Sequence, residues 1–240
     1  MSEQVRDSQL HGRQVNEMFA SIAPRYDLTN SVLSLGIHHW WRRRLIRLAG
    51  IAPGQHVLDC ATGTGDVAIA LKKRVGDSGE VLATDFCAQM LEHAPAKARA
   101  KGLDINFAQA DAMDLPYESD RFDCATISFG IRNVSDPQKC LQEMARVVRP
   151  GGKVAVLEFG QPGGILFGPL YRFYSERVLP RIGGIITGNH AAYSYLNRTS
   201  ANFPCSDAFL NLMDESDSFG ERTATPLSFG IAWAYVGSVK

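Results

Sequence analysis

The sequence predicts a doubly wound α/β fold built on a mostly parallel sheet. Between residues 51 and 160, short apolar runs alternate with helical patterns, which is typical of repeated βαβ units. Several of these runs end in an acid or a hydroxyl residue, and a glycine-containing loop follows the first of them. Because ligands bind beyond the carboxyl ends of such strands, the pattern that predicts the fold also predicts where a site lies.

Length and composition fit a single domain. At 240 residues, with 45% hydrophobic and 21% charged side chains, the chain can bury one sizeable core. We expect one domain over residues 1–240, with a helical cap at 13–50, a cofactor-binding core at 51–160, a lid insertion at 161–205 and strands in 206–240. Basic and acidic residues number 25 each, and this balance argues against a nucleic-acid partner.

Cysteine usage and hydropathy bear on the compartment. Five cysteines occur without a C-x-x-C pair, which argues against a disulfide framework and a zinc site and favours the reducing cytoplasm. The polar stretch 1–13 is unlike a signal peptide, and no run approaches the ~20 apolar residues of a membrane span. We expect a cytoplasmic protein without a bound metal, and peripheral contact with the inner face of a membrane stays open.

The cap combines helical and pocket-like patterns. Residues 1–12 are expected to fray, and apolar side chains recur at helical spacing over 13–22. The stretch 26–41 then carries aromatic, imidazole and amide groups within an apolar segment, ahead of a basic helix. Polar side chains spaced through an apolar segment favour the wall of a pocket. For Trp40 and Trp41, which open the basic helix, we expect packing of the cap against the core.

Strands and helices alternate through the core, and the alternation stops after it. Pro95 predicts a kink or a break in its helix. An aromatic helix over 170–179 lies between two Gly-Gly pairs, and two further strands turn near Pro226. Strands are predicted at 56–60, 80–84, 105–108, 122–128, 153–159, 218–225 and 229–239, and core helices at 67–75, 88–100 and 137–148.

The glycine loop after the first strand fits two cofactors. Residues 63–68 match the G-x-G-x-x-A dinucleotide pattern, and Asp85 follows about 20 residues later. Two acids, Asp59 and Asp66, flank the loop, and carboxylates beside a pyrophosphate would repel it. S-adenosylmethionine has no phosphate and presents an ammonium and a sulfonium group, so the charges of the loop favour this cofactor over a nicotinamide dinucleotide.

The strand ends supply candidates for holding S-adenosylmethionine. Asp85 would accept hydrogen bonds from the ribose hydroxyls. Asp111 with Ala112 would suit the adenine edge, the carboxylate accepting from the exocyclic amine. The full set of cofactor-binding candidates is Asp59, Gly63, Thr64, Gly65, Asp85, Asp111, Ala112 and Ser128.

Several motifs together resemble a known enzyme family. The glycine loop, Asp85, residues 122–123 and the Arg-Pro-Gly-Gly turn at 149–152 resemble class I S-adenosylmethionine-dependent methyltransferases, which have a Rossmann-like fold. Departures are Ala61, where many of these enzymes have glycine, and Gly160, where serine is expected. Within that class, residues 26–34, 36–41, 129–134, 146–159, 179–183, 193–196 and 203–204 resemble the menaquinone/ubiquinone biosynthesis C-methyltransferases.

The resemblance implies methylation of a ring carbon on a polyprenylated quinol precursor, with S-adenosylmethionine as methyl donor. Demethylmenaquinol, which would become menaquinol, is the first acceptor we expect, and the ubiquinone-pathway benzoquinol is the second. The apolar lid would host the isoprenoid tail, and a homodimer is the assembly we consider. Two alternatives stay open: a non-catalytic methyltransferase-fold scaffold of a quinone-synthesis complex, and a nicotinamide oxidoreductase.

Ring methylation needs a carbon nucleophile. A phenolic hydroxyl titrates near pH ~10, so the site must favour its deprotonation. Arg132, past the fourth strand, is the first catalytic candidate, because its charge could lower the phenol pKa or orient a water that accepts the proton. His38 and Tyr26 are the second candidates, as a direct base or for orienting the ring. The predicted substrate-binding residues are Asn30, Asn133 and Tyr193.

Overall fold

One mixed sheet organises the molecule. The computed structural model describes residues 3–163, 167–187 and 189–240, with backbone alone at 3–11, 167, 187, 190 and 193. Within these residues seven strands lie in the order β3-β2-β1-β4-β5-β7-β6. Neighbouring strands from β3 to β5 are parallel, and β7 is antiparallel to both β5 and β6. The predicted doubly wound, mostly parallel α/β fold is confirmed.

Strands and helices follow one another through the core as the sequence pattern indicates. The strands are β1 (His56–Cys60), β2 (Glu80–Asp85), β3 (Asn106–Gln109), β4 (Phe122–Ser128), β5 (Val148–Phe159), β6 (Phe219–Leu227) and β7 (Ala232–Val239). The α-helices are α1 (Glu3–Ile22), α2 (Tyr26–Leu33), α3 (Ile37–Leu48), α4 (Asp66–Val75), α5 (Ala88–Leu91), α6 (Ala94–Arg99), α7 (Pro137–Val147), α8 (Phe167–Phe173), α9 (Leu179–Thr187), α10 (His190–Asn202) and α11 (Asp207–Glu215). Short helical turns are η1 (Ala23–Arg25), η2 (Ile131–Asn133), η3 (Tyr174–Val178) and η4 (Ser228–Gly230).

Helices cover both faces of the sheet. Side chains of α3 and α4 pack in one buried cluster with β1, β5 and β7, and those of α7 and α11 pack in a second cluster on the other face. The buried strands β1 and β4 carry near-continuous apolar runs, as strands covered on both faces do. This two-sided core fixes the strand ends that carry the candidate site residues.

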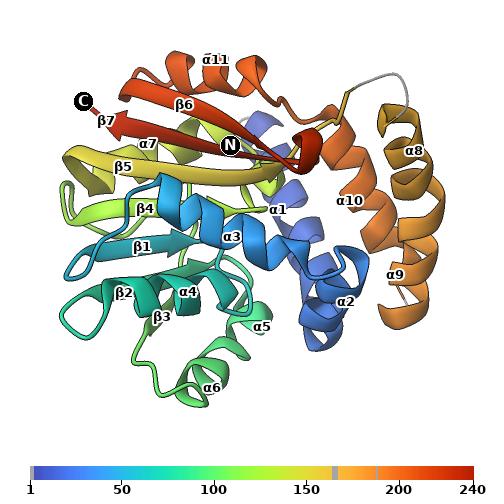
Figure 1. The fold of residues 1–240 in the computed structure, drawn as a ribbon, viewed down its shortest axis with the longest axis horizontal. Helices are drawn as coiled ribbons and strands as arrows, with labels where there is room; N and C mark the ends of the chain where they lie inside the picture. The colour runs from blue at the N-terminus through green and yellow to red at the C-terminus, as the bar shows by residue number, and fades with distance from the viewer. Residues whose placement is uncertain (1–2, 164–166, 188) are drawn as a thin grey trace.

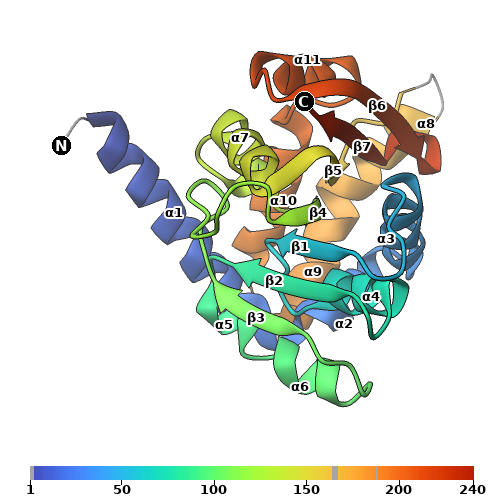
Figure 2. The same cartoon turned by 90° about the vertical axis from the view of Figure 1, so that its left-hand side faces the viewer.

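A second group of helices lies beyond the carboxyl ends of the parallel strands. In Figure 1, α2, α8, α9 and α10 stand together on the side toward which the arrows of β1 and β4 point. Figure 2 shows α1 reaching this group from the other side, with its N-terminal part extending away from the sheet. None of the described helices is both long and apolar enough to cross a membrane.

The N-terminal elements correct three predictions. Helix α1 begins at Glu3, where fraying was predicted, and α3 begins at Ile37 rather than at Trp40. Trp41 is buried in the core, as expected, but Trp40 is 48% exposed, so its predicted packing was wrong. The two tryptophans differ because adjacent residues of an α-helix point to different faces, and only the face of Trp41 meets the core.

Two prolines, Pro95 and Pro226, lie where the structure refines or corrects the predicted elements. The predicted helix over 88–100 is divided into α5 and α6, with the break just before Pro95, as the proline indicated. Pro226 is not at a turn: it lies inside β6, an edge strand that tolerates the missing N–H, and the chain turns at η4. The fifth strand starts at Val148, the aromatic helix is divided into α8, η3 and α9, and α11 was not predicted.

Candidate active site

The glycine loop between β1 and α4 has the backbone conformation that requires glycine. Gly63 has φ +58° and Gly65 has φ +85°, a region that side chains disfavour. A Cβ on Gly65 would also lie 3.0 Å from the Ala94 Cβ. Asp85 lies against this loop, since its Oδ2 accepts a hydrogen bond from the Gly63 N–H at 2.7 Å. The loop and the acid of β2 therefore form one cradle.

Ala61, the departure from the usual glycine, also has a positive φ of 49°. Its methyl group occupies the space beside Gly130, because a Cβ on Gly130 would lie 2.5 Å from the Ala61 Cβ. The loop thus accommodates alanine at the cost of backbone strain, and Gly130 supplies the room.

Asp59 supports the loop from inside the sheet. Its carboxylate accepts hydrogen bonds from the Thr126 hydroxyl at 2.5 Å and the Thr62 hydroxyl at 2.7 Å, and the residue is 1% exposed. Burial raises the pKa of Asp59 to about 6, although the two threonine hydroxyls lower it. Its structural partners are therefore threonines, and any effect on the cofactor acts through the loop.

Asp66 corrects the charge argument made from the sequence. Its carboxylate forms ion pairs with Arg42, at 2.6 Å, and with Lys97. Burial raises the pKa of Asp66, but Arg42 and Lys97 outweigh it and the net shift is downward. Because two cations neutralise it, Asp66 does not give the loop a free negative charge, and this part of the case against a dinucleotide was wrong.

The same network ties the cap to the cofactor loop. The Thr64 hydroxyl donates to Asp27 Oδ1 at 2.6 Å, and Lys97 also pairs with Asp27.

Three residues near the loop have the side chains that a metal ion could use. His38, His39 and Asp66 place ligand atoms within 4.8 Å of one another, but the cations bound to Asp66 oppose a metal there.

The other cofactor candidates lie at neighbouring strand ends. Asp111 Oδ1 accepts from the Met113 N–H at 2.9 Å, and Ala112 is buried beside it. The Ser128 hydroxyl is buried and has no hydrogen-bond partner among the described residues. A glycine cradle, an adjacent acid and an unsatisfied hydroxyl at one sheet edge suit a nucleoside cofactor such as S-adenosylmethionine.

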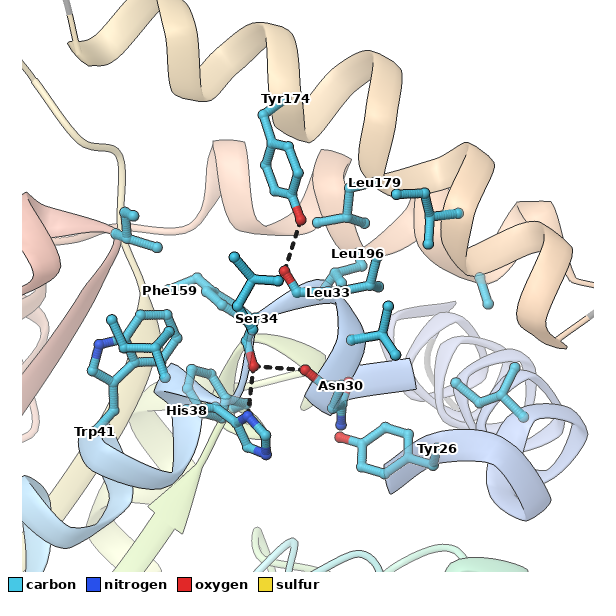
Figure 3. Close-up of a pocket in the computed structure, with 18 of the residues that line it drawn as sticks. Tyr26, Asn30, Leu33, Ser34, His38, Trp41, Phe159, Tyr174, Leu179 and Leu196 are labelled. Carbon is cyan, nitrogen blue, oxygen red and sulfur yellow. Dashed lines mark hydrogen bonds between the residues drawn. The ribbon is translucent and has the colours of Figure 1, made fainter. Parts of the chain in front are cut away.

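A cavity of about 620 Å³ lies between the cap, α8–α10 and the strand ends. Apolar and aromatic side chains form most of its wall, and Figure 3 shows them converging from several elements. Three polar residues predicted from the sequence, Tyr26, Asn30 and His38, all line it, as does Arg132. The structure therefore brings these four candidates, from α2, α3 and η2, to one cavity.

Arg132 is held by a buried ion pair that the sequence did not indicate. Its Nη1 donates to Glu158 Oε1 at 2.7 Å and to the Phe129 carbonyl at 2.6 Å. The side chains are 5% and 1% exposed. Burial raises the pKa of Glu158 against the opposing effect of Arg132. Glu158 thus offsets the positive charge of Arg132, whose Nε has no partner among the described residues.

Glu158 could have been found from the sequence. It stands near the end of an apolar strand, β5, as Asp59 does in β1 and Asp85 in β2. An acid at the end of such a run is the signal that singled out the other two. Residue spacing gave no way to pair it with Arg132.

The polar residues of the cap are linked to one another. The Tyr26 hydroxyl lies beside the Asn30 side chain (Figure 3), and burial raises the pKa of Tyr26 although Asn30 lowers it. His38 Nδ1 lies 2.5 Å from the hydroxyl oxygen of Ser34. Burial, followed by the charge of Arg42, lowers the pKa of His38 to about 4, so the imidazole is neutral at neutral pH.

Of the other two predicted substrate-binding residues, Asn133 lies outside the cavity wall and the Tyr193 side chain is not described. Asn133 is not part of the cavity wall; its Nδ2 donates to the Phe129 carbonyl at 3.3 Å, and its buried Oδ1 has no partner among the described residues. Tyr193 lies in α10, and its side chain is outside the described residues. Tyr195, two residues further and not predicted, lines the cavity.

The fold and the sequence both match known methyltransferases. A Thermotoga maritima structure described as an S-adenosylmethionine-dependent methyltransferase, possible histamine N-methyltransferase, superposes with a TM-score of 0.66 at 19% identity, over 94% of this chain and 100% of that one. An Aquifex aeolicus S-adenosylmethionine-dependent methyltransferase gives 0.57 at 19% identity, over 83% and 89%. At these identities the likeness shows the fold alone.

Sequence relatives are much closer. The ubiquinone/menaquinone biosynthesis C-methyltransferase UbiE of Bdellovibrio bacteriovorus is 56% identical, over 94% of this chain and 96% of its own. Demethylmenaquinone methyltransferases of Deinococcus radiodurans and Thermus thermophilus are 47% and 46% identical, covering 97% and 92% of this chain and 95% and 99% of theirs. The sequence model of the ubiE/COQ5 methyltransferase family matches residues 6–239. This family implies S-adenosylmethionine as the methyl donor and confirms an enzyme rather than a scaffold or a nicotinamide oxidoreductase, and the chain belongs to the ubiE/COQ5 methyltransferase family.

Proposed function

We propose that this C-methyltransferase methylates a ring carbon of a polyprenylated quinol, with demethylmenaquinol as the acceptor. The cavity is the observation that carries the proposal: it measures about 620 Å³ and is mostly apolar, and its polar residues include Tyr26, Asn30, His38 and Arg132. A hydroxylated ring would occupy the polar part and an isoprenoid tail the apolar part. Two relatives named demethylmenaquinone methyltransferases support the naphthoquinol over the benzoquinol.

The position of the cavity beside the glycine loop also supports the proposed function. Asp27, which follows Tyr26 directly, is bonded to Thr64 of the loop. Arg42, which lines the cavity, is bonded to Asp66 at the start of α4. The polar side of the cavity is therefore next to the loop that would hold S-adenosylmethionine. Bound there, S-adenosylmethionine supplies an electrophilic methyl group on its sulfonium.

Arg132 would act on the ring hydroxyl. Its guanidinium lines the cavity and would stabilise a developing phenolate oxygen, while Glu158 and the Phe129 carbonyl hold its Nη1 in place. Because Glu158 offsets much of its charge, we propose that Arg132 acts by directed hydrogen bonding more than by lowering the phenol pKa at a distance. Tyr26 and Asn30, which lie next to each other in the cavity wall, would orient the ring.

We also propose that the mouth of the cavity contacts an anionic lipid surface. Four apolar side chains line the cavity and are at the same time exposed; this apolar rim consists of Val32, Leu35, Ile37 and Leu170. Leu35 is 92% exposed. The rim's own helices α3 and α8 also carry exposed arginines, Arg43 and Arg172, which suit anionic headgroups. The protein would then be cytoplasmic and peripheral to the membrane.

One assay tests the acceptor. The purified protein, S-adenosylmethionine and either short-chain demethylmenaquinol or the demethylated benzoquinol are incubated, and the products are weighed by mass spectrometry. We expect one added methyl group on the naphthoquinol. Transfer to the benzoquinol alone would replace the proposed acceptor, and transfer to neither would reject the proposed function.

A vesicle assay tests the lipid contact. We expect co-sedimentation with vesicles of phosphatidylglycerol but not of phosphatidylcholine, and at least tenfold weaker binding for Leu35→Glu. Ser78→Glu, an exposed residue in the turn between α4 and β2, is the charge-matched control. Equal binding of both variants would contradict the proposed surface.

A further inference from the structure

Ser34 lies between two groups that compete for its hydroxyl. The Ser34 Oγ is 2.6 Å from the Asn30 carbonyl oxygen and 2.5 Å from His38 Nδ1, and both contacts are drawn in Figure 3. A serine hydroxyl has one proton and lone pairs that accept. The carbonyl oxygen has no proton to give, so the Ser34 hydroxyl must donate to it.

The contact with His38 then has only one favourable arrangement. With the Ser34 proton directed at Asn30, a lone pair of the hydroxyl oxygen faces His38 Nδ1. Two acceptors at 2.5 Å would repel each other, so Nδ1 must carry the proton and donate to Ser34. In a neutral imidazole the other nitrogen, Nε2, is then an acceptor.

The backbone keeps Ser34 in this position. Ser34 caps the end of α2, and its N–H also donates to the Asn30 carbonyl, at 3.0 Å. Gly36, with φ +76°, turns the chain into α3, which brings His38 against Ser34 one turn later. Both ends of the contact are thus fixed by helix termini.

His38 is placed to use the free nitrogen. It is buried and lines the cavity. In Figure 3 the ring turns its second nitrogen away from Ser34, on the side where the Tyr26 hydroxyl lies. The charged or titratable neighbours are Arg42, His39, Asp66 and Asp27, and burial with Arg42 outweighs the two acids, which keeps the ring neutral.

We infer that Ser34 is a positioning residue: it holds His38 in the Nδ1–H form, so that His38 Nε2 accepts a hydrogen bond from a ring hydroxyl of the substrate. The identity of that hydroxyl rests on the proposed function. The tautomer of His38 does not, because it is a property of the protein without substrate.

Nitrogen-15 NMR of the imidazole tests the tautomer directly. The signals of His38 are assigned by their loss in His38→Gln. In the unmodified protein we expect a protonated Nδ1 and an unprotonated Nε2, and in Ser34→Ala a shift toward the Nε2–H form that free histidine prefers. Ser34→Thr, which keeps the hydroxyl, should retain the original form. An Nε2–H tautomer in the unmodified protein, or no change in Ser34→Ala, would overturn the inference.

Kinetics separate positioning from a structural role. We expect Ser34→Ala to raise KM for the quinol about tenfold, the loss of one buried hydrogen bond, with unchanged affinity for S-adenosylmethionine by calorimetry. Ser34→Thr should recover most of the effect. Ser31→Ala, on the same helix but outside the cavity wall, is the matched control. Equal losses in Ser34→Ala and Ser31→Ala, or a loss confined to S-adenosylmethionine affinity, would overturn the role. Failure of the unmodified protein to methylate either quinol would instead reject the proposed function, and the NMR result distinguishes the two failures.

Discussion

Arg132 and Glu158 form an ion pair 2.7 Å long at the ends of neighbouring segments, with almost no exposed surface on either side chain. Removing two charges from water costs free energy, and only a close ion pair between them offsets that cost. The pair therefore makes the position of the guanidinium, in the wall of the cavity, depend on a carboxylate in β5.

Removing that carboxylate charge should destabilise the protein. For Glu158→Gln we expect a loss of about 3 kcal/mol in the free energy of unfolding, because Arg132 would be left buried without a counter-charge. Urea unfolding measures it. Arg149→Gln, which breaks the more exposed Arg149–Asp123 pair, is the control and should cost less than about 1 kcal/mol. Equal costs would show that burial of the first pair has no effect.

Arg132 should matter for turnover more than for cofactor binding. We expect Arg132→Ala to lower kcat by about 10²-fold with S-adenosylmethionine affinity retained, since a donor to the developing phenolate is lost. Arg132→Lys keeps the charge beside Glu158 but loses the planar guanidinium, and should fold normally and still turn over slowly. Full turnover in either variant, measured with saturating quinol, would contradict the role.

Asp85 should contribute to the affinity for S-adenosylmethionine. In Asp85→Ala we expect calorimetry to show affinity roughly tenfold to hundredfold lower, because a charged acceptor for the ribose and a bond to the Gly63 N–H are both removed. Asp77→Ala, an exposed acid in a surface turn, should leave the affinity unchanged. An unchanged affinity in Asp85→Ala would reject the ribose role.

Gly130 and Ala61 should be energetically coupled. Gly130→Ala places a methyl group 2.5 Å from the Ala61 Cβ and should cost about 1–3 kcal/mol of stability. Ala61→Gly removes that neighbour and relieves a positive φ, so the cost of Gly130→Ala should be smaller in the double variant. A double-mutant cycle by thermal or urea unfolding gives the coupling, and additive costs would rule out the contact.

Stability should depend on pH through His38. Its folded pKa of about 4 lies below the ordinary 6.5, so between these values the unfolded chain binds more protons and His38 makes stability rise with pH. Asp59, raised to about 6, acts oppositely between its ordinary value of 3.8 and that pKa. The measurement is the difference between the unmodified protein and His38→Gln in urea titrations at pH 4.5 to 7. We expect the unmodified protein to gain up to about 3 kcal/mol relative to the variant over this range; parallel curves would contradict the shift.

The sequence predicts local geometry well here, because local chemistry determines it. The spacing of glycines after β1 predicted a tight loop that needs glycine. Gly63 and Gly65 do adopt the positive φ angles that other residues disfavour. Strand β4 has the predicted bounds, since its apolar run is flanked by clear turn residues. The stretch from Tyr26 to Trp41 was predicted as a pocket wall, and its polar residues Tyr26, Asn30, Ser34 and His38 line the cavity.

Partners distant in the sequence could not be predicted. The neutralisation of Asp66 by Arg42 and Lys97, and the pairing of Glu158 with Arg132, depend on which elements the topology brings together. Ser34 was not predicted as a site residue because its effect depends on the direction of one proton, set by the Asn30 carbonyl. Helix α11 is short, and its apolar residues Phe209 and Met213 gave too weak a periodicity to separate it from the strands.

The antiparallel strand β7 lies between β5 and β6 in the sheet. During synthesis on the ribosome, the edge of β5 that pairs with β7 therefore has no partner strand until residues 232–239 have been made. Exposed strand edges of this kind are where nascent chains aggregate. A chaperone that shields the edge of β5 should thus raise the yield of folded enzyme, and a pause that delays the synthesis of β7 should lower it.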